Sequence, residues 1–208
     1  MPFTLDTVIA LTSLENAKQQ NQIPPAEPGQ DDILTRFINE ASQALENRTS
    51  RKLKERTYTE YHDGRNNNRL ITLQWPVNSI AELWVDSSGE FTDVTKKLDP
   101  TDYYIDQQKE GIVLRGACGG FFSKGIRNIQ VIYDAGYDPV PADLEGACLW
   151  MVEFLYDMRS DERVGHQSKS KNSENVTFNQ DVPQFVLDTI ERYSRFEFPL
   201  ATMGVLNL

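Results

Sequence analysis

The segment that most constrains the fold runs from residue 126 to residue 159, because it predicts a strand, a turn and a helix in succession. Apolar side chains stand at every second position of its first part, at Ile129, Val131 and Tyr133. This alternation is typical of a strand with at least one buried face. Gly136 then allows a positive φ, and Pro141 has the fixed φ that suits the first position of a helix. We therefore expect the strand to end near Gly136 and a helix to begin near Pro141.

That helix has a buried stripe. Its apolar side chains follow the i, i+3/i+4 spacing and are Leu144, Ala147, Cys148, Met151, Val152 and Leu155. Arg159 near its end complements the helix dipole. Tyr156 and Arg159 lie at the exposed end, where they either contact another subunit or only cap the helix.

Two further helices are predicted before residue 57. Thr12 and Glu15 have capping-box spacing, which predicts a short helix from about Ser13 to Gln20. After a proline-rich connection, Asp31 or Asp32 is expected to cap a second helix. The apolar face of this helix comprises Leu34, Phe37, Ile38, Ala41, Ala44 and Leu45, and its far end carries Arg48, Arg51 and Lys52. The arm 1–11 is either an additional helical turn or a segment that docks on another subunit.

From Tyr58 to Tyr133 the hydrophobic period changes from helical to alternating. Turn signals at Asp63-Gly64 and Ser87-Ser88-Gly89 separate short antiparallel strands. The glycine-rich segment 116–125 lacks the Gly-Lys-Ser/Thr ending of a phosphate-binding loop and precedes a strand, so a mobile hairpin tip is the better interpretation.

The last part of the chain combines a polar loop, a helix and an apolar tail. Residues 160–181 are rich in polar side chains, and a loop of this length in a compact domain is commonly functional or disordered. Pro183 begins the last helix, in which Phe185, Val186, Leu187 and Ile190 are expected to make apolar contacts. The tail beyond Tyr193 is apolar but carries Pro199 and Gly204, so it needs a partner surface rather than forming a helix.

These elements predict an α+β fold in which N- and C-terminal helices form a bundle around an inserted antiparallel β-rich region. We expect one domain over 1–208. Its parts are the N-terminal helices at 12–56, the β-rich insert at 57–134, the C-terminal helices with their polar loop at 141–194, and an extended tail at 195–208.

The composition excludes several functions. The chain has 21 Lys and Arg against 31 Asp and Glu, a net charge of −10, so a sequence-independent grip on DNA phosphates is not expected. Cys118 and Cys148 have neither zinc spacing nor a disulfide framework and are expected to be reduced thiols in a cytosolic setting. No run approaches the roughly 20 apolar residues that cross a bilayer, so a soluble protein is expected.

No catalytic, cofactor or metal site is predicted. His62 and His166 lack a serine or cysteine in a nucleophile-elbow context. Asp99, Asp102 and Asp106 do not follow a calcium-binding loop and are interpreted as a solvated strand edge. The tryptophans are expected to pack, with Trp75-Pro76 anchoring a sheet corner and Trp84 and Trp150 buried against neighbouring side chains.

The order of these motifs resembles the head-to-tail connector proteins of tailed bacteriophages, also called adaptor or head completion proteins. The residues that carry the resemblance are Tyr133-Asp134-Ala135-Gly136-Tyr137, Val140-Pro141, the alanine-containing helix and its Tyr156-x-x-Arg159 end. The likeness extends over roughly residues 12–195. No single motif is specific, and their order and spacing carry the comparison.

The resemblance implies a non-enzymatic virion protein, assembled in the host bacterial cytoplasm, that forms a ring at the portal vertex and part of the DNA channel. The implied partners are the portal protein, neighbouring copies in a ring of twelve, a stopper or tail-completion protein, and passing genomic DNA without sequence-specific binding; no membrane is involved. A tail or baseplate module that forms no portal ring is the alternative.

The resemblance also assigns two sets of contact residues. The portal-binding tail comprises Phe196, Phe198, Leu200, Met203, Val205, Leu206 and Leu208, and the intersubunit loop comprises Gly165, Ser168, Ser170, Val176 and Phe178.

Overall fold

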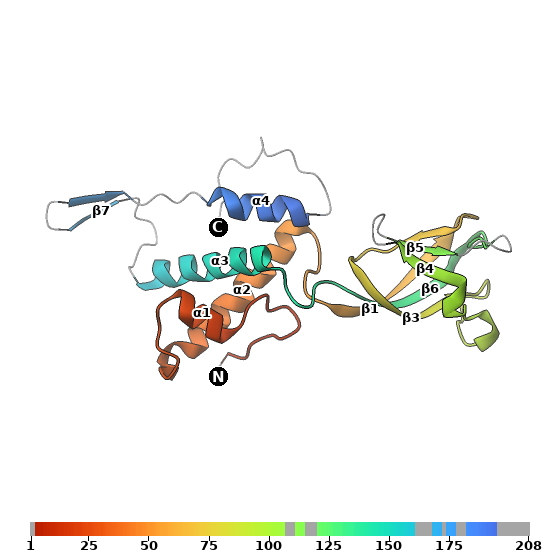
Figure 1. Ribbon diagram of the computed structural model, residues 1–208, viewed down its shortest axis with the longest axis horizontal. Helices are drawn as coiled ribbons and strands as arrows, with labels where there is room; N and C mark the ends of the chain where they lie inside the picture. Colours follow the sequence, from red (N-terminus) through yellow and green to blue (C-terminus); the bar gives the residue numbers. More distant parts are fainter. Residues whose placement is uncertain are drawn as a thin grey trace. The chain divides into compact units, whose positions relative to one another are not determined.

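The computed structural model describes residues 3–106, 111–114, 120–160, 168–171, 174–177 and 182–194. The chain forms two compact units, one from Met1–Leu53 with Pro139–Leu208 and one from Lys54–Asp138. The first, which we call the helical unit, is built from both ends of the chain. The second, the β-rich unit, is one continuous segment that contains the predicted insert (Figure 1). The predicted α+β fold class is confirmed; the division of 1–208 as a single domain stays a prediction.

The helical unit consists of four helices and a hairpin. Helices α1 (Leu14–Gln20) and α2 (Asp31–Thr49) come from the N-terminal part, with a 3₁₀ turn at Pro28–Gln30 before α2. Helices α3 (Ala142–Ser160) and α4 (Gln184–Tyr193) come from the C-terminal part. Between them lie β7 (Ser168–Lys171) and β8 (Glu174–Thr177).

Helices α2 and α3 pack face to face through their predicted apolar stripes, and α1 and α4 contact both of them. The fully buried members of these stripes are Leu34, Ile38, Ala41, Leu45, Leu144, Ala147, Cys148 and Val152. A polar contact lies inside this core, since the Ser42 hydroxyl accepts the Leu11 backbone N–H at 3.1 Å and lies 3.5 Å from the Cys148 sulfur. Helix α4 contributes Val186, Ile190 and Tyr193 to the buried core, whereas Phe185 is 49% exposed and lies outside it.

The caps of the first two helices differ from the prediction. Ser13 is the N-cap of α1 and accepts the Asn16 N–H at 3.1 Å, while Thr12 instead donates to the Glu145 carboxylate at 2.8 Å. The N-cap is therefore Ser13, one residue after the predicted Thr12. Helix α2 begins at Asp31, and its N-cap, Gln30, makes no side-chain capping bond. The 3₁₀ turn before α2 makes a carboxylate cap unnecessary, because it continues the chain directly into the helix.

The β-rich unit contains two three-stranded antiparallel sheets. The first has the order β1 (Arg56–Gly64), β6 (Gly125–Ala135), β3 (Val77–Val85). The second has the order β2 (Arg69–Ile71), β5 (Gly111–Leu114), β4 (Tyr103–Asp106). Short 3₁₀ turns lie at Val94–Lys96 and Pro100–Asp102.

The inward side chains of β6 hold this unit together. The alternation predicted for that strand is confirmed, since Ile129, Val131 and Tyr133 are at most 1% exposed. They join one cluster with Leu70, Val77, Leu83, Tyr103, Ile112 and Phe122. Trp84 is buried at 8% exposure, and in the helical unit Trp150 stacks on Phe154 with the ring centroids 5.4 Å apart, as the packing prediction required. The Trp75-Pro76 peptide bond is cis.

One predicted turn of the β-rich unit is wrong and two are present. Asp63 and Gly64 end strand β1, where Gly64 pairs with Gly125 across a register irregularity. Glycine is needed there for space, because a Cβ would lie 1.8 Å from the Ser123 carbonyl oxygen. Gly89 has φ +74° in the predicted turn after β3, and Gly136 has φ +117° after β6.

Candidate assembly surfaces

The two predicted contact regions lie mainly outside the described residues. All seven residues of the portal-binding tail fall there, as do Gly165 and Phe178 of the intersubunit loop and the glycine-rich residues 116–119. Ser168 and Ser170 lie on β7, and Val176 lies on β8. The backbone of these strands forms an antiparallel hairpin in which Ser168 pairs with Thr177 and Lys169 pairs with Val176. The polar loop therefore carries regular structure that its composition did not predict.

Two cations that follow α2, Arg51 and Lys52, bind groups of the helical unit itself. Helix α2 ends at Thr49, so Arg51 and Lys52 follow it. Arg51 is only 4% exposed and donates to the Tyr193 carbonyl oxygen of α4 at 3.0 Å. Lys52 pairs at 3.0 Å with Glu46, whose buried carboxylate also accepts the Leu53 N–H at 3.1 Å. Both cations are therefore used within the fold.

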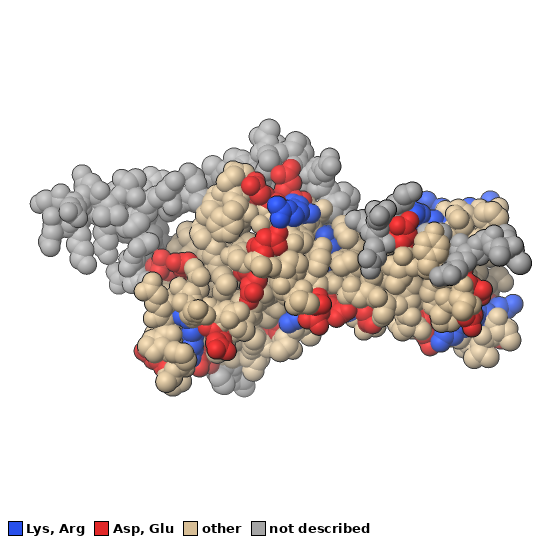
Figure 2. Space-filling model, viewed as in Figure 1, with Lys and Arg blue, Asp and Glu red and all other residues tan. Residues whose placement is uncertain are grey.

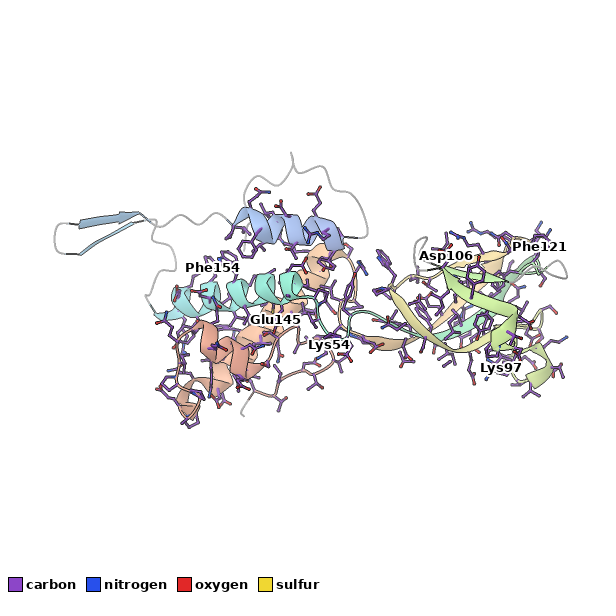
Figure 3. The ribbon with its side chains drawn as sticks, viewed as in Figure 1. Lys54, Lys97, Asp106, Phe121, Glu145 and Phe154 are labelled. Atoms are coloured by element: carbon purple, nitrogen blue, oxygen red, sulfur yellow. The ribbon has the colours of Figure 1, made fainter. Side chains whose placement is uncertain are left out.

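Two carboxylates connect α3 to its neighbours in the helical unit. Glu145, which Figure 3 labels on α3, accepts from the Thr12 hydroxyl at 2.8 Å and the Asn16 amide at 2.7 Å. Asp143 accepts from the Tyr193 hydroxyl at 2.8 Å and from Arg192 at 2.6 Å. Burial opposes ionisation of Asp143, but these donors and the Leu144 N–H outweigh it and lower its pKa.

Arg159 contacts its own subunit, because its guanidinium donates to the Gln30 side-chain oxygen at 3.3 Å. Of the two interpretations of the α3 end, this contact supports an intrasubunit role for Arg159. Tyr156 is partly buried.

The histidine of the β-rich unit belongs to a structural network. His62 Nε2 lies 2.7 Å from the Glu60 carboxylate, which also receives the Tyr133 hydroxyl and the Leu73 N–H. The Tyr133 hydroxyl in turn accepts the Gln74 N–H at 3.1 Å, so the network joins strands β1 and β6 to the segment after β2. Burial, with the hydrogen bond to Glu60, raises the pKa of Tyr133 far above its usual range, so this phenol stays protonated.

Cys148, Asp99 and Asp106 are also used structurally, and His166 and Cys118 lie outside the described residues. Burial raises the pKa of the Cys148 thiol to about 12, which leaves too little thiolate for nucleophilic chemistry. Asp99 caps a 3₁₀ turn by accepting the Thr101 N–H at 2.9 Å, and Asp106 pairs with Arg69. Over the described ranges, no group of three or more His, Cys, Asp or Glu side chains is placed to hold a metal ion. None of the described helices is long and apolar enough to cross a membrane.

One surface feature was missed by the sequence analysis. Side chains of β1, β6 and the turn after β3 line a hollow of about 570 Å³ in the β-rich unit, with Tyr61, Phe91 and Arg127 in its wall. Arg127 has a left-handed φ of 47° inside β6. No residue pattern signals such a backbone conformation at an arginine, because that region is normally occupied by glycine or asparagine.

Charged groups on the drawn face of the molecule are dispersed (Figure 2). Asp and Glu lie over both units, and Lys and Arg form small separate groups among them. The β-rich unit has 10 Lys and Arg against 13 Asp and Glu, and the helical unit has 11 against 18. The acidic excess is therefore larger in the helical unit.

Comparison with known proteins gives a consistent result. The sequence model of the head completion protein family matches residues 10–196. No curated protein matches the chain. Among solved structures, a chain in the neck of an empty GTA particle computed with C6 symmetry matches at a TM-score of 0.58 and 18% identity, covering 100% of this chain and 97% of that one. A chain in the neck of a native GTA particle computed with C12 symmetry matches at a TM-score of 0.56 and 20% identity, covering 100% and 98%. A chain of the native gene transfer agent virion matches at 0.56 and 18%, covering 100% and 97%.

Proposed function

We propose, since the chain belongs to the head completion protein family, that it is a non-enzymatic subunit of a ring in the neck of a phage-like particle, where it joins the head to the tail. The observation that carries this proposal is the family match over residues 10–196, which spans both units of the fold. The shared fold with chains in the necks of gene transfer agent particles supports it.

The ring has twelve copies in this proposal. The support is that one neck with a chain of the same fold was computed with C12 symmetry. The ring sits on the portal protein, receives a stopper or tail-completion protein on its other side, and encloses part of the DNA channel. A head-to-tail contact repeated around a rotation axis closes into such a ring.

The experiment that tests the proposal measures mass by light scattering, first on the full-length protein alone and then after mixing with portal-bearing heads. We expect attachment to the heads and a stoichiometry of twelve copies per portal vertex. Failure to attach would overturn the portal-ring proposal and favour a tail or baseplate module.

The intersubunit contact is assigned to Gly165, Ser168, Ser170, Val176 and Phe178. The support is that an antiparallel hairpin at β7 and β8 offers extended backbone to a neighbour, and paired backbone edges are a common mode of association. The double variant V176D/F178D should assemble poorly while its subunit melts normally. The matched control is V94D/F121D, which places the same two changes at side chains that are 75% and 56% exposed in the β-rich unit. Equal assembly of the two variants would contradict the assignment.

The portal contact is assigned to the tail residues Phe196, Phe198, Leu200, Met203, Val205, Leu206 and Leu208. Apolar side chains in a segment with no helix or strand pattern need a partner surface. Deleting residues 196–208 should leave the melting temperature nearly unchanged and abolish attachment to portal-bearing heads. A truncated protein that still attaches would exclude the tail as the portal contact.

Genomic DNA passes the ring without sequence-specific binding in this proposal. The net charge of −10 and the internal use of Arg51 and Lys52 both support a surface that repels the duplex. A gel shift at low ionic strength, where screening extends over roughly 30 Å, should show no retention of double-stranded DNA. Tight, salt-sensitive retention would contradict this part of the proposal.

A further inference from the structure

The hollow in the β-rich unit is built from segments that are distant in the sequence. Its lining comprises Tyr61 from β1, Ile126, Arg127 and Gln130 from β6, and the turn residues Ser88, Gly89, Glu90 and Phe91. The Gln130 amide donates to the Tyr61 hydroxyl at 2.9 Å, and the Tyr61 and Phe91 ring centroids are 5.6 Å apart. The Tyr61 side chain is thus held by Gln130 and by Phe91.

Arg127 is held in this wall by a strained backbone. Its φ of 47° lies in the left-handed region, and its N–H donates to the Asp63 carboxylate at 2.7 Å. The guanidinium carbon lies 5.0 Å from the centroid of the Tyr61 ring. Across the described part of the chain this guanidinium makes no ion pair. Backbone strain of this kind persists where the surrounding structure enforces it and often marks a functional position.

The opposite wall is rigid as well. The Asp86 carboxylate accepts the Ser88 N–H at 2.9 Å, the Ser88 hydroxyl at 2.8 Å and the Phe91 N–H at 3.2 Å. The Gly89 N–H closes the same turn on the Asp86 carbonyl oxygen at 3.1 Å. Phe91, with φ 53°, is therefore presented by a preformed turn, which lowers the entropy that a partner must remove on binding.

An apolar side chain stands free at the edge of the hollow. Ile126 is 87% exposed, the largest exposure among the large apolar side chains of the described residues. Tyrosine and arginine are enriched among the residues that contribute most to protein–protein binding, and an adjacent apolar side chain completes such a cluster.

We propose that this hollow docks the acidic helical unit of a second copy of this chain, with Arg127 pairing a carboxylate of the neighbour. The inference rests on the proposed ring. The helical unit carries 18 Asp and Glu against 11 Lys and Arg, so a copy offers many carboxylates to the Arg127 guanidinium. Because the two surfaces differ, the contact is head-to-tail and can repeat around a ring. Glu90 also lines the hollow, and the helical unit of a copy carries 11 Lys and Arg that can pair with it, whereas the phosphates of DNA would only be repelled.

The test places a benzophenone photo-cross-linking amino acid at position 126 of the full-length protein, replacing Ile126. Irradiation of the concentrated protein and of protein bound to portal-bearing heads should yield covalent dimers whose cross-linked peptides come from the helical unit. The control places the same group at position 71 on β2, where Ile71 is 62% exposed and does not line the hollow. Equal dimer yields at the two positions would overturn the proposal.

The role of the guanidinium is tested in the cross-linking protein by adding Arg127→Gly or Arg127→Glu. Glycine relieves the left-handed strain, so Arg127→Gly should fold at least as stably as the parent and yet reduce dimer cross-linking about tenfold. Undiminished cross-linking in the glycine variant would overturn the proposal. Normal rings on portal-bearing heads in the Arg127→Glu variant would overturn this inference and leave the proposed function intact, whereas failure of the parent to attach at all would reject both.

Discussion

The helical unit and the β-rich unit bury polar groups in different ways. In the helical unit, buried Glu46 holds the chain that follows α2, Arg51 joins that chain to α4, and Glu145 joins α3 to the segment around α1. The bonds of Arg51 and Glu145 connect the two ends of the chain. In the β-rich unit, Glu60 connects neighbouring strands within one continuous segment. The comparison indicates that the helical unit depends on long-range contacts between chain ends, whereas the β-rich unit contains all the contacts that its own core needs.

The largest losses of stability should come from substitutions that open a cavity of the same kind in each unit. Leu144 and Leu83 are both fully buried, the first in the helical unit and the second in the β-rich unit. Replacing either by alanine should lower the free energy of unfolding by about 3 kcal/mol, because lost apolar contacts and a residual cavity add up. Urea unfolding followed by far-UV circular dichroism and by tryptophan fluorescence should show that each variant shifts the transition of its own unit. Identical shifts of a single shared transition would contradict the separation of the two units.

Buried carboxylates provide a second comparison. Glu46→Ala removes the acceptor of the Leu53 N–H, and Glu60→Ala removes the acceptor of the Leu73 N–H and the Tyr133 hydroxyl. Each should cost about 2 kcal/mol, since a buried donor without a partner loses its solvation. The measurement is urea unfolding at neutral pH.

The control for these variants is Glu40→Ala. Glu40 forms an exposed i, i+4 pair with Arg36 at 2.7 Å, and its removal should change stability by no more than about 0.5 kcal/mol. A loss at Glu46 or Glu60 as small as the control would show that water replaces the protein donors at those sites.

The sequence predicted the helical unit better than the β-rich unit, for a physical reason. The apolar stripes of α2 and α3 repeat over several turns, and every turn adds to the signal. The start of α3 after Pro141 and the start of α4 after Pro183 were also predicted, because proline fixes φ at the first turn. What failed was the identity of single caps, since Ser13 and Thr12 carry similar hydroxyls and only the three-dimensional contact of Thr12 with Glu145 separates them.

The β-rich unit depends on features that short strands do not encode in their own residues. The alternation in β6 predicted its buried face, but the pairing of β1 with β6, two strands far apart in the sequence, is decided by tertiary contacts. Gly64 suggested a turn and instead allows close approach to Ser123, and Arg127 adopts a backbone conformation that its residue type disfavours. The candidate surface around Arg127 was therefore invisible in the sequence, while the tail and loop were singled out by their composition and given their partners by the resemblance.

Substitutions at a helix cap or a turn should lower the stability less, and by similar amounts in the two units. Ser13→Ala removes the N-cap bond to the Asn16 N–H and should cost about 1 kcal/mol. Gly89→Ala forces a side chain into a φ of +74° and should also cost about 1 kcal/mol, although the added Cβ would meet only the Arg127 carbonyl oxygen at 3.9 Å. Thermal unfolding measures both. Ser13→Gly also removes the hydroxyl but leaves the Asn16 N–H open to water, so it should cost only a few tenths of a kcal/mol. A loss equal to that of alanine would show that water does not replace the cap bond.

The smallest effects should appear as the pH dependence of stability, with one carboxylate in each unit. Hydrogen bonds from the hydroxyls of Ser79 and Thr57, both at 2.6 Å, lower the pKa of Asp134 in the β-rich unit. The pKa of Asp143 in the helical unit is lowered by its donors against the effect of burial. A carboxylate with a lowered folded-state pKa contributes its full stabilisation above the unfolded pKa of about 3.9, and this contribution is lost as the pH falls through the folded pKa.

Unfolding free energies measured from pH 7 down to pH 3 should therefore decline less steeply below pH 5 in Asp134→Asn and Asp143→Asn than in the parent. Each substitution should flatten the profile of its own unit alone, and a flattened profile in the opposite unit would show that the two units are energetically coupled.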